Sequence, residues 1–78
     1  MEIKKWDTET KLQMFELELC ECLYIFKNKS KLSKQTAYDL LNITFWKLWE
    51  KKYHMSENEK KIMFKTLEDT LENAYKEI

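Results

Sequence analysis

The chain has 78 residues, which suffices for one domain over residues 1–78, and an apolar fraction of 44% excludes pervasive disorder. It contains no glycine and no proline, which excludes glycine-rich phosphate loops and favours an all-α fold, because nothing breaks the helical patterns. The 14 lysines and 14 acidic residues give a formal net charge of +0, which weighs against nucleic acid as the main partner.

The first predicted helix spans about residues 8–28, and Asp7 is placed to cap its N-terminus. Apolar side chains at helical spacing form one face: Leu12, Phe15, Leu19, Cys22, Leu23 and Phe26. A second apolar group falls roughly opposite: Met14, Leu17, Tyr24 and Ile25. Only one of these sides can face the core of a small bundle. We therefore expect Met14, Leu17 and Ile25 to belong to a partner-binding surface.

The second predicted helix spans about residues 33–53, with Ser33 as its N-cap. Its aliphatic stripe is expected to face the core: Ala37, Leu40, Leu41, Thr44 and Leu48. An aromatic band adjoins this stripe, and its members nearest to the stripe, Tyr38 and Phe45, are expected to be buried. Trp46, Trp49 and Tyr53 lie farther away, so they either complete the core or anchor a partner, as Trp and Tyr often do at interfaces.

The third predicted helix spans about residues 57–78 and opens with a capping box, in which Ser56 and Glu59 bond each other's backbone N–H groups. Its apolar stripe is narrow: Phe64, Leu67, Leu71, Ala74, Tyr75 and Ile78. Three helices of matched length with short connections predict an antiparallel up-down-up three-helix bundle. Without glycine, any turn that needs a positive φ would have to use asparagine.

The residues Leu41-Asn42-Ile43-Thr44 resemble the Leu-Gly-Val-Ser turn of the helix-turn-helix DNA-binding motif. The resemblance implies a recognition helix that presents Lys47, Lys51 and Lys52 to phosphates. Tyr38, however, stands where the motif has a small residue, and the apolar stripe continues through Asn42 without a change of phase. We therefore expect one continuous helix, and we keep a nucleic-acid-binding regulator as an alternative function.

The sequence carries no pattern typical of a catalytic, metal or cofactor site. His54 is the only histidine, and Cys20 and Cys22 point apart on a helix, so they cannot share a metal and are expected to be small core residues. The acidic residues Glu16, Glu18 and Glu21 lack the spacing of a bundle metal site and are expected to form a solvated face. We therefore do not expect an enzyme.

The surplus apolar surface predicts a non-catalytic helical interaction protein that binds and regulates or inhibits a partner protein. A self-associating structural bundle, in which a homodimer buries the aromatic face, is a further alternative. No apolar stretch is long enough to span a membrane and no signal peptide is recognised, so we expect a cytoplasmic protein. The abundance of Lys, Asn, Ile and Glu is typical of proteins from AT-rich bacteria, their phages or mobile elements.

Overall fold

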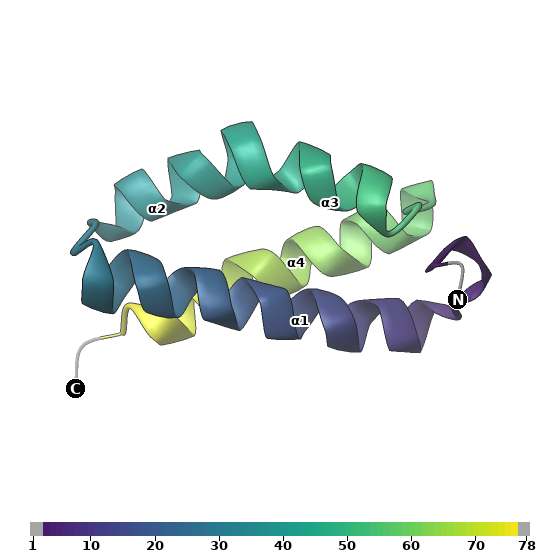
Figure 1. The fold of residues 1–78 in the computed structure, drawn as a ribbon, viewed down its shortest axis with the longest axis horizontal. Coiled ribbons are helices and arrows are strands. Elements are labelled where there is room, and N and C mark those ends of the chain that lie inside the picture. The colour runs from purple at the N-terminus through teal and green to yellow at the C-terminus, as the bar shows by residue number, and fades with distance from the viewer. Residues whose placement is uncertain (1–2, 77–78) are drawn as a thin grey trace.

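The computed structural model describes residues 3–76, which form three long helices and no strand (Figure 1). The first helix comprises α1 (Thr8–Tyr24) and the π-helical turn η2 (Ile25–Lys29), and the short 3₁₀ turn η1 (Ile3–Lys5) precedes it. The second helix comprises α2 (Lys34–Leu40), the π-helical turn η3 (Leu41–Phe45) and α3 (Trp46–Lys52). The third helix is α4 (Glu57–Ala74).

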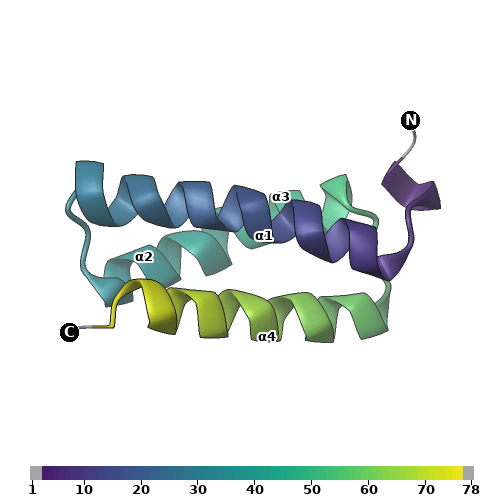
Figure 2. The ribbon, with the colours of Figure 1, turned by 90° about the horizontal axis from the view of Figure 1, so that it is seen from below.

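The three helices run up, down and up, which confirms the predicted three-helix bundle. Figure 2 shows α1 and α4 running in the same direction, with α2 and α3 running in the opposite direction. The observed helix boundaries lie close to the predicted ones, except that α4 ends at Ala74. Ile78, predicted at the end of the third apolar stripe, lies outside the described residues.

Each helix begins at the predicted capping residue. The Asp7 carboxylate accepts a hydrogen bond from the backbone N–H of Thr10 at 2.8 Å. The Ser33 hydroxyl accepts one from the N–H of Thr36 at 3.2 Å. The capping box of α4 forms in full, with both of its hydrogen bonds present. Local side-chain chemistry therefore fixes where all three helices start.

The two connections between the helices use positive φ without glycine or asparagine. Lys31 has a φ of 56° and His54 a φ of 48°, so the prediction that asparagine would take such positions is wrong. At the second connection, the N–H of Met55 reaches back to the carbonyl of Glu50 at 3.2 Å, which reverses the chain in the manner of a helix C-cap. The left-handed conformation costs an ordinary residue about 1–2 kcal/mol, which the rest of the fold must offset.

Aromatic rings fill the space between α3 and the other two helices. Phe15 of α1 packs edge-on against Trp49 at 5.1 Å between ring centroids, and less closely against Trp46 at 6.1 Å. Trp46 in turn packs edge-on against Phe64 of α4 at 5.1 Å. The buried apolar core draws on all three helices and the second connection: Phe15, Leu19, Leu23, Phe26, Ala37, Leu41, Trp49, Tyr53, Met55, Met63, Leu67 and Leu71.

The second helix faces the core differently from the prediction. Thr44 is exposed and Leu48 is 60% exposed, so their predicted core positions are wrong. Trp49 and Tyr53 are instead only 4% and 1% exposed. Phe45, predicted to be buried, is half-buried and packs against the core. The side chains that face inward thus change phase along the helix.

The π turn η3 explains this change of phase. The inward positions are spaced by four residues: Ala37, Leu41, Phe45, Trp49 and Tyr53. In a regular α-helix of about 3.6 residues per turn, each step of four would rotate the side chain by about 40° away from the core. In η3 the N–H of Trp46 bonds to the carbonyl of Leu41, one residue farther back than in an α-helix. This extra residue turns α3 back by about 100°, so that Trp49 and Tyr53 point inward.

The backbone is helical throughout residues 34–52, which confirms the predicted single helix. No turn separates α2 from α3, so the geometry of a helix-turn-helix motif is absent from this segment. The prediction of an unchanged phase at Asn42 is wrong, because Asn42 lies inside η3. Figure 1 shows the second helix bowing at η3, as expected where a π turn interrupts an α-helix.

Candidate interaction surface

The outer side of the first helix carries a group of exposed apolar side chains. We call it the first-helix face, and it consists of Met14, Leu17, Cys20, Glu21, Tyr24 and Ile25. Leu17 and Tyr24 are 60% and 59% exposed, and Met14 and Ile25 are 39% and 47% exposed. The predicted residues Met14, Leu17 and Ile25 therefore share one exposed surface. Their role in binding a partner stays a prediction.

The first-helix face is shallowly hollowed. Its residues from Leu17 to Ile25 line an open depression of about 380 Å³. A second depression, of about 240 Å³, continues from Cys20 and Tyr24 across to Thr70 and Ala74 on α4. Such a surface can receive the side chains of another helix, because ridges on one helix pack into the grooves of its neighbour.

Negative charge borders the part of the first-helix face that lies on α1, whereas Lys27 of η2 is exposed beside Tyr24 on the side toward α4. Glu9, Glu16 and Glu21 are exposed on α1. Lys11, which is the lone lysine of α1, is only 5% exposed and points toward α4. The solvent side of α1 therefore combines apolar side chains with carboxylates and has no exposed cation of its own.

Glu18 joins the first helix to α3, although the sequence suggested that it would be solvated. Its carboxylate accepts a hydrogen bond from the indole N–H of Trp49 at 2.7 Å. It also forms an ion pair with Lys52. Burial, together with the nearby Glu18 carboxylate, raises the pKa of the Tyr53 phenol. Glu18 thus satisfies the one polar group of a buried tryptophan and fixes how α3 sits beside α1.

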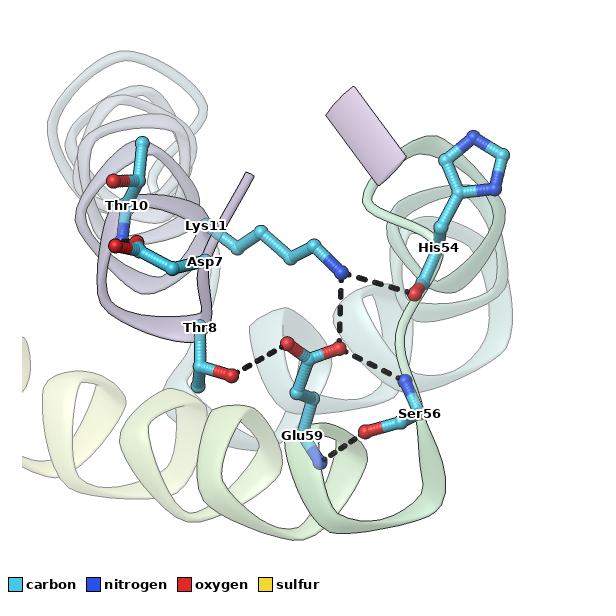
Figure 3. A network of polar contacts seen from close by, with 7 residues as sticks. All are labelled: Asp7, Thr8, Thr10, Lys11, His54, Ser56 and Glu59. Atoms are coloured by element: carbon cyan, nitrogen blue, oxygen red, sulfur yellow. Dashed lines mark hydrogen bonds and ion pairs between the residues drawn. The ribbon is translucent and has the colours of Figure 1, made fainter. Parts of the chain in front are cut away.

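A buried polar network joins the start of α1 to the start of α4 (Figure 3). The Lys11 ammonium lies 3.0 Å from the Glu59 carboxylate and donates a second hydrogen bond to the His54 carbonyl at 3.2 Å. The Thr8 hydroxyl donates to the other Glu59 oxygen at 2.7 Å. Burial alone would raise the pKa of Glu59, but the hydrogen bonds from Ser56, Thr8 and Lys11 and the charge of Lys11 lower it to about 2.

Sequence reasoning recognised Glu59 as a capping residue and missed its ion pair with Lys11. The two residues are 48 positions apart, so no local pattern links them. One signal was available, because Lys11 precedes Phe15 by four residues and so extends the buried stripe of α1. A lysine on such a stripe indicates an acidic partner on another helix.

The aromatic residues predicted as partner anchors lie mainly in the core. Trp49 and Tyr53 are buried, because the extra residue in η3 turns them inward. Neither side chain is therefore accessible to a partner in this conformation. Trp46 is half-buried between Phe15 and Phe64. Its remaining exposed edge lines a groove of about 500 Å³ between α3 and α4, whose rim carries lysines and glutamates in equal measure: Glu50, Glu57, Lys60, Lys61, Lys65 and Glu68.

The solvent side of the second helix combines apolar and basic side chains. We call it the second-helix face, and it consists of Ile43, Lys47, Leu48 and Lys51. Ile43 is 72% exposed and Leu48 is 60% exposed. Lys47 and Lys51, which the nucleic-acid alternative invoked together with Lys52, are also exposed. Lys52 is exposed as well, but it is paired with Glu18.

Of the two cysteines predicted to be core residues, Cys22 packs against the core and Cys20 does not. Cys22 is half-buried against the core, and burial with the charges of Glu18 and Glu21 raises the pKa of its thiol. Cys20 is exposed on the first-helix face. Among residues 3–76, no three histidine, cysteine or acidic side chains are grouped so as to hold a metal ion.

Known proteins do not assign this surface a role. The sequence matches no protein family, and comparisons with curated proteins and with solved structures find no match. Within the part of the chain that the structure describes, no helix has both the length and the apolar character needed to cross a membrane. The chemistry of the exposed faces is therefore the basis for a functional proposal.

Proposed function

We propose that this chain is a non-catalytic interaction protein that binds a partner protein on its first-helix face and regulates or inhibits it. The observation that carries the proposal is the set of four large apolar side chains, 39–60% exposed, on one side of one helix. Single exposed apolar residues are ordinary on a protein surface, whereas a contiguous group with a polar rim is typical of an interaction site.

The fold does not need these side chains for its own core. The opposite side of the same helix supplies Phe15, Leu19, Leu23 and Phe26, which complete the packing against the other helices. Polar residues at Leu17 or Tyr24 would therefore leave the bundle intact. Their apolar character gains free energy only when another surface covers them, at roughly 25 cal/mol for each Å² of apolar area removed from water.

The surrounding charge indicates the chemistry of the partner. Carboxylates flank the apolar side chains, and no exposed lysine interrupts them on α1. A partner that presents an apolar ridge between lysine or arginine side chains would match both features. Such complementarity raises the rate of association and disfavours acidic competitors.

Affinity capture with matched variants tests the proposal. The bait is the tagged chain, applied to an extract of cells that make it naturally, and Leu17→Ser is compared with Ile62→Ser. Both variants remove one exposed aliphatic side chain from a helix, but Ile62 lies on α4, outside the first-helix face. We expect a protein that wild type and Ile62→Ser retain and Leu17→Ser loses, and that the purified chain then binds directly.

Circular dichroism must show equal helix content for the three chains. If wild type and both variants retain the same proteins, or if no purified candidate binds the chain, the first-helix face does not serve as the proposed binding surface.

A further inference from the structure

We propose that the partner on the first-helix face is a second copy of this chain, whose second-helix face supplies the apolar and basic groups. The inference rests on the part of the proposed function that makes the first-helix face a protein-binding surface, and it names the occupant of that surface. The required chemistry, an apolar ridge beside cations, is present on the chain itself. Ile43 and Leu48 form the ridge, and Lys47 and Lys51 provide the cations.

The π turn η3 contributes to this chemistry. In a regular α-helix, Leu48 would lie seven residues from Leu41 on the buried side. The extra residue in η3 turns Leu48 outward, to 60% exposure, and Ile43 within η3 is 72% exposed. Two large aliphatic side chains thus stand among lysines, where the first-helix face has its aliphatic side chains among glutamates.

The two faces adjoin along the seam between α1 and α3. The ion pair between Glu18 and Lys52 crosses this seam. Met14 and Ile25 lie on the same edge of the first helix as Glu18, at spacings of four and seven residues, and Leu48 lies one turn before Lys52. One side of the monomer therefore presents an acidic apolar helix beside a basic apolar helix.

This arrangement selects one kind of symmetric dimer. A two-fold axis across the bundle would place first helix on first helix and second on second, which brings like charges together. A two-fold axis along the bundle places the first-helix face of each copy on the second-helix face of the other. Glu21 of each copy then faces Lys47 and Lys51 of the other copy. The dimer is closed, because the same patch is used by both copies.

The reciprocal contact also increases the area that the interface buries. Specific interfaces bury about 600 Å² or more from each partner, which is roughly a tenth of the 5568 Å² surface of this chain. The reciprocal contact uses both faces of each copy, so it buries more surface than a contact through the first-helix face alone.

Charge exchange across the interface tests the dimer. The mass of the wild-type chain, of Glu21→Lys and of Lys47→Glu is measured by sedimentation equilibrium over a wide range of concentration. We expect wild type to rise from 9.7 kDa to twice that mass, and each single variant to stay near 9.7 kDa. An equimolar mixture of the two variants should recover the dimer, because every contact between them joins opposite charges. Lys61→Glu, the same charge change on α4, should dimerise as wild type does.

Several results would overturn the dimer. They are a wild-type mass that stays at 9.7 kDa, single variants that dimerise like wild type, a mixture that remains monomeric, and a mass that continues to grow beyond two copies. A monomeric chain whose Leu17→Ser variant still loses a captured protein would refute the second copy and leave the proposed function standing. A monomeric chain whose Leu17→Ser variant loses nothing would remove both.

Discussion

At the scale of single residues, the pair Lys11 and Glu59 shows how this small bundle accommodates buried charge. Both side chains are more than nine-tenths buried, and each keeps further polar partners besides the other. A buried ion pair contributes little compared with a well-packed apolar pair, but removing one partner leaves an uncompensated charge. The network therefore makes the start of α4 sensitive to the state of a single carboxyl group.

We predict that Glu59→Gln lowers the free energy of unfolding by about 3 kcal/mol at neutral pH, because Lys11 loses its buried counter-charge. The pKa of Glu59 is lowered to about 2 in the folded chain, from 4.5 in the unfolded chain. Acid therefore protonates the unfolded chain first. The contribution of Glu59 to stability is complete above about pH 5 and is lost as the pH falls through about 2. Thermal unfolding of the wild-type chain and of Glu59→Gln between pH 7 and pH 2 measures this contribution to the free energy of unfolding.

The matched control is Glu57→Gln, an exposed acid in the same helical turn, which should change stability by less than about 0.5 kcal/mol. A gap between wild type and Glu59→Gln that stays constant down to pH 2 would contradict the assigned role of the carboxylate.

At the scale of helices, the boundaries were predictable and the phase of the second helix was not. Asp7, Ser33 and Ser56 bond within three residues, so the sequence reveals the helix starts directly. The side of α3 that faces the core depends on one extra residue in η3. A helical wheel assumes the same rotation for every residue, so it cannot predict this change of direction. The spacing of four from Ala37 to Tyr53 was the available signal, since it suits a helix that is locally wound more loosely.

The candidate binding residues likewise fall into a group whose exposure was predictable and a group whose exposure was not. Met14 and Leu17 lie within the regular winding of α1, and Ile25 is the first residue of η2, directly after that winding, so the constant pitch still places all three on the exposed side as the pattern indicated. Trp49 and Tyr53 follow the π turn, and their positions were predicted from the wrong phase. Which aromatic residues are available to a partner could therefore be decided only from the folded backbone.

We predict opposite outcomes for removing and adding one residue in η3. Deletion of Ile43 returns the second helix to regular α-helical winding with its core side chains still on one side, so the free energy of unfolding should change by less than about 1 kcal/mol. Insertion of one alanine after Ile43 adds a further rotation of about 100° and turns Trp49 and Tyr53 out of the core. It should therefore cost more than about 3 kcal/mol. Urea unfolding followed by circular dichroism compares the two.

Because both changes fall at one position and alter the second helix by one residue, they shift its end along the helix axis by a similar distance of about 1.5 Å. Equal losses of stability from the deletion and the insertion would mean that η3 does not set the phase of α3.

At the scale of the whole molecule, Trp46 is a side chain that brings the three helices into contact. It extends from the second helix, packs against Phe15 of the first and Phe64 of the third, and leaves one edge toward solvent. A ring in this position packs the second helix against both of the others. The Trp46 ring therefore stabilises the bundle, whether or not a partner binds to its exposed edge.

We predict that Trp46→Ala lowers the free energy of unfolding by about 3 kcal/mol, because the substitution leaves a cavity between three helices. Trp46→Phe, which keeps an aromatic edge toward Phe15 and Phe64, should lose about 1 kcal/mol. Chemical unfolding monitored by circular dichroism gives both values. An unchanged unfolding midpoint for Trp46→Ala would show that the ring is dispensable to the bundle and would return Trp46 to the candidate binding residues.

The π turn η3 has one further consequence, which concerns alternative registers of the same chain. If the second helix wound regularly from Ala37 onward, Thr44 and Leu48 would face inward and the rings of Trp49 and Tyr53 would face water. The two registers differ in the backbone hydrogen bonds of η3. The two rings have a larger apolar area than Thr44 and Leu48, so burying the rings favours the observed register. The second helix therefore selects its register by side-chain size rather than by helix propensity. The solvent accessibility of the Trp49 ring, which is 4% exposed in the observed register and would face water in the regular one, reports how fully that selection is made.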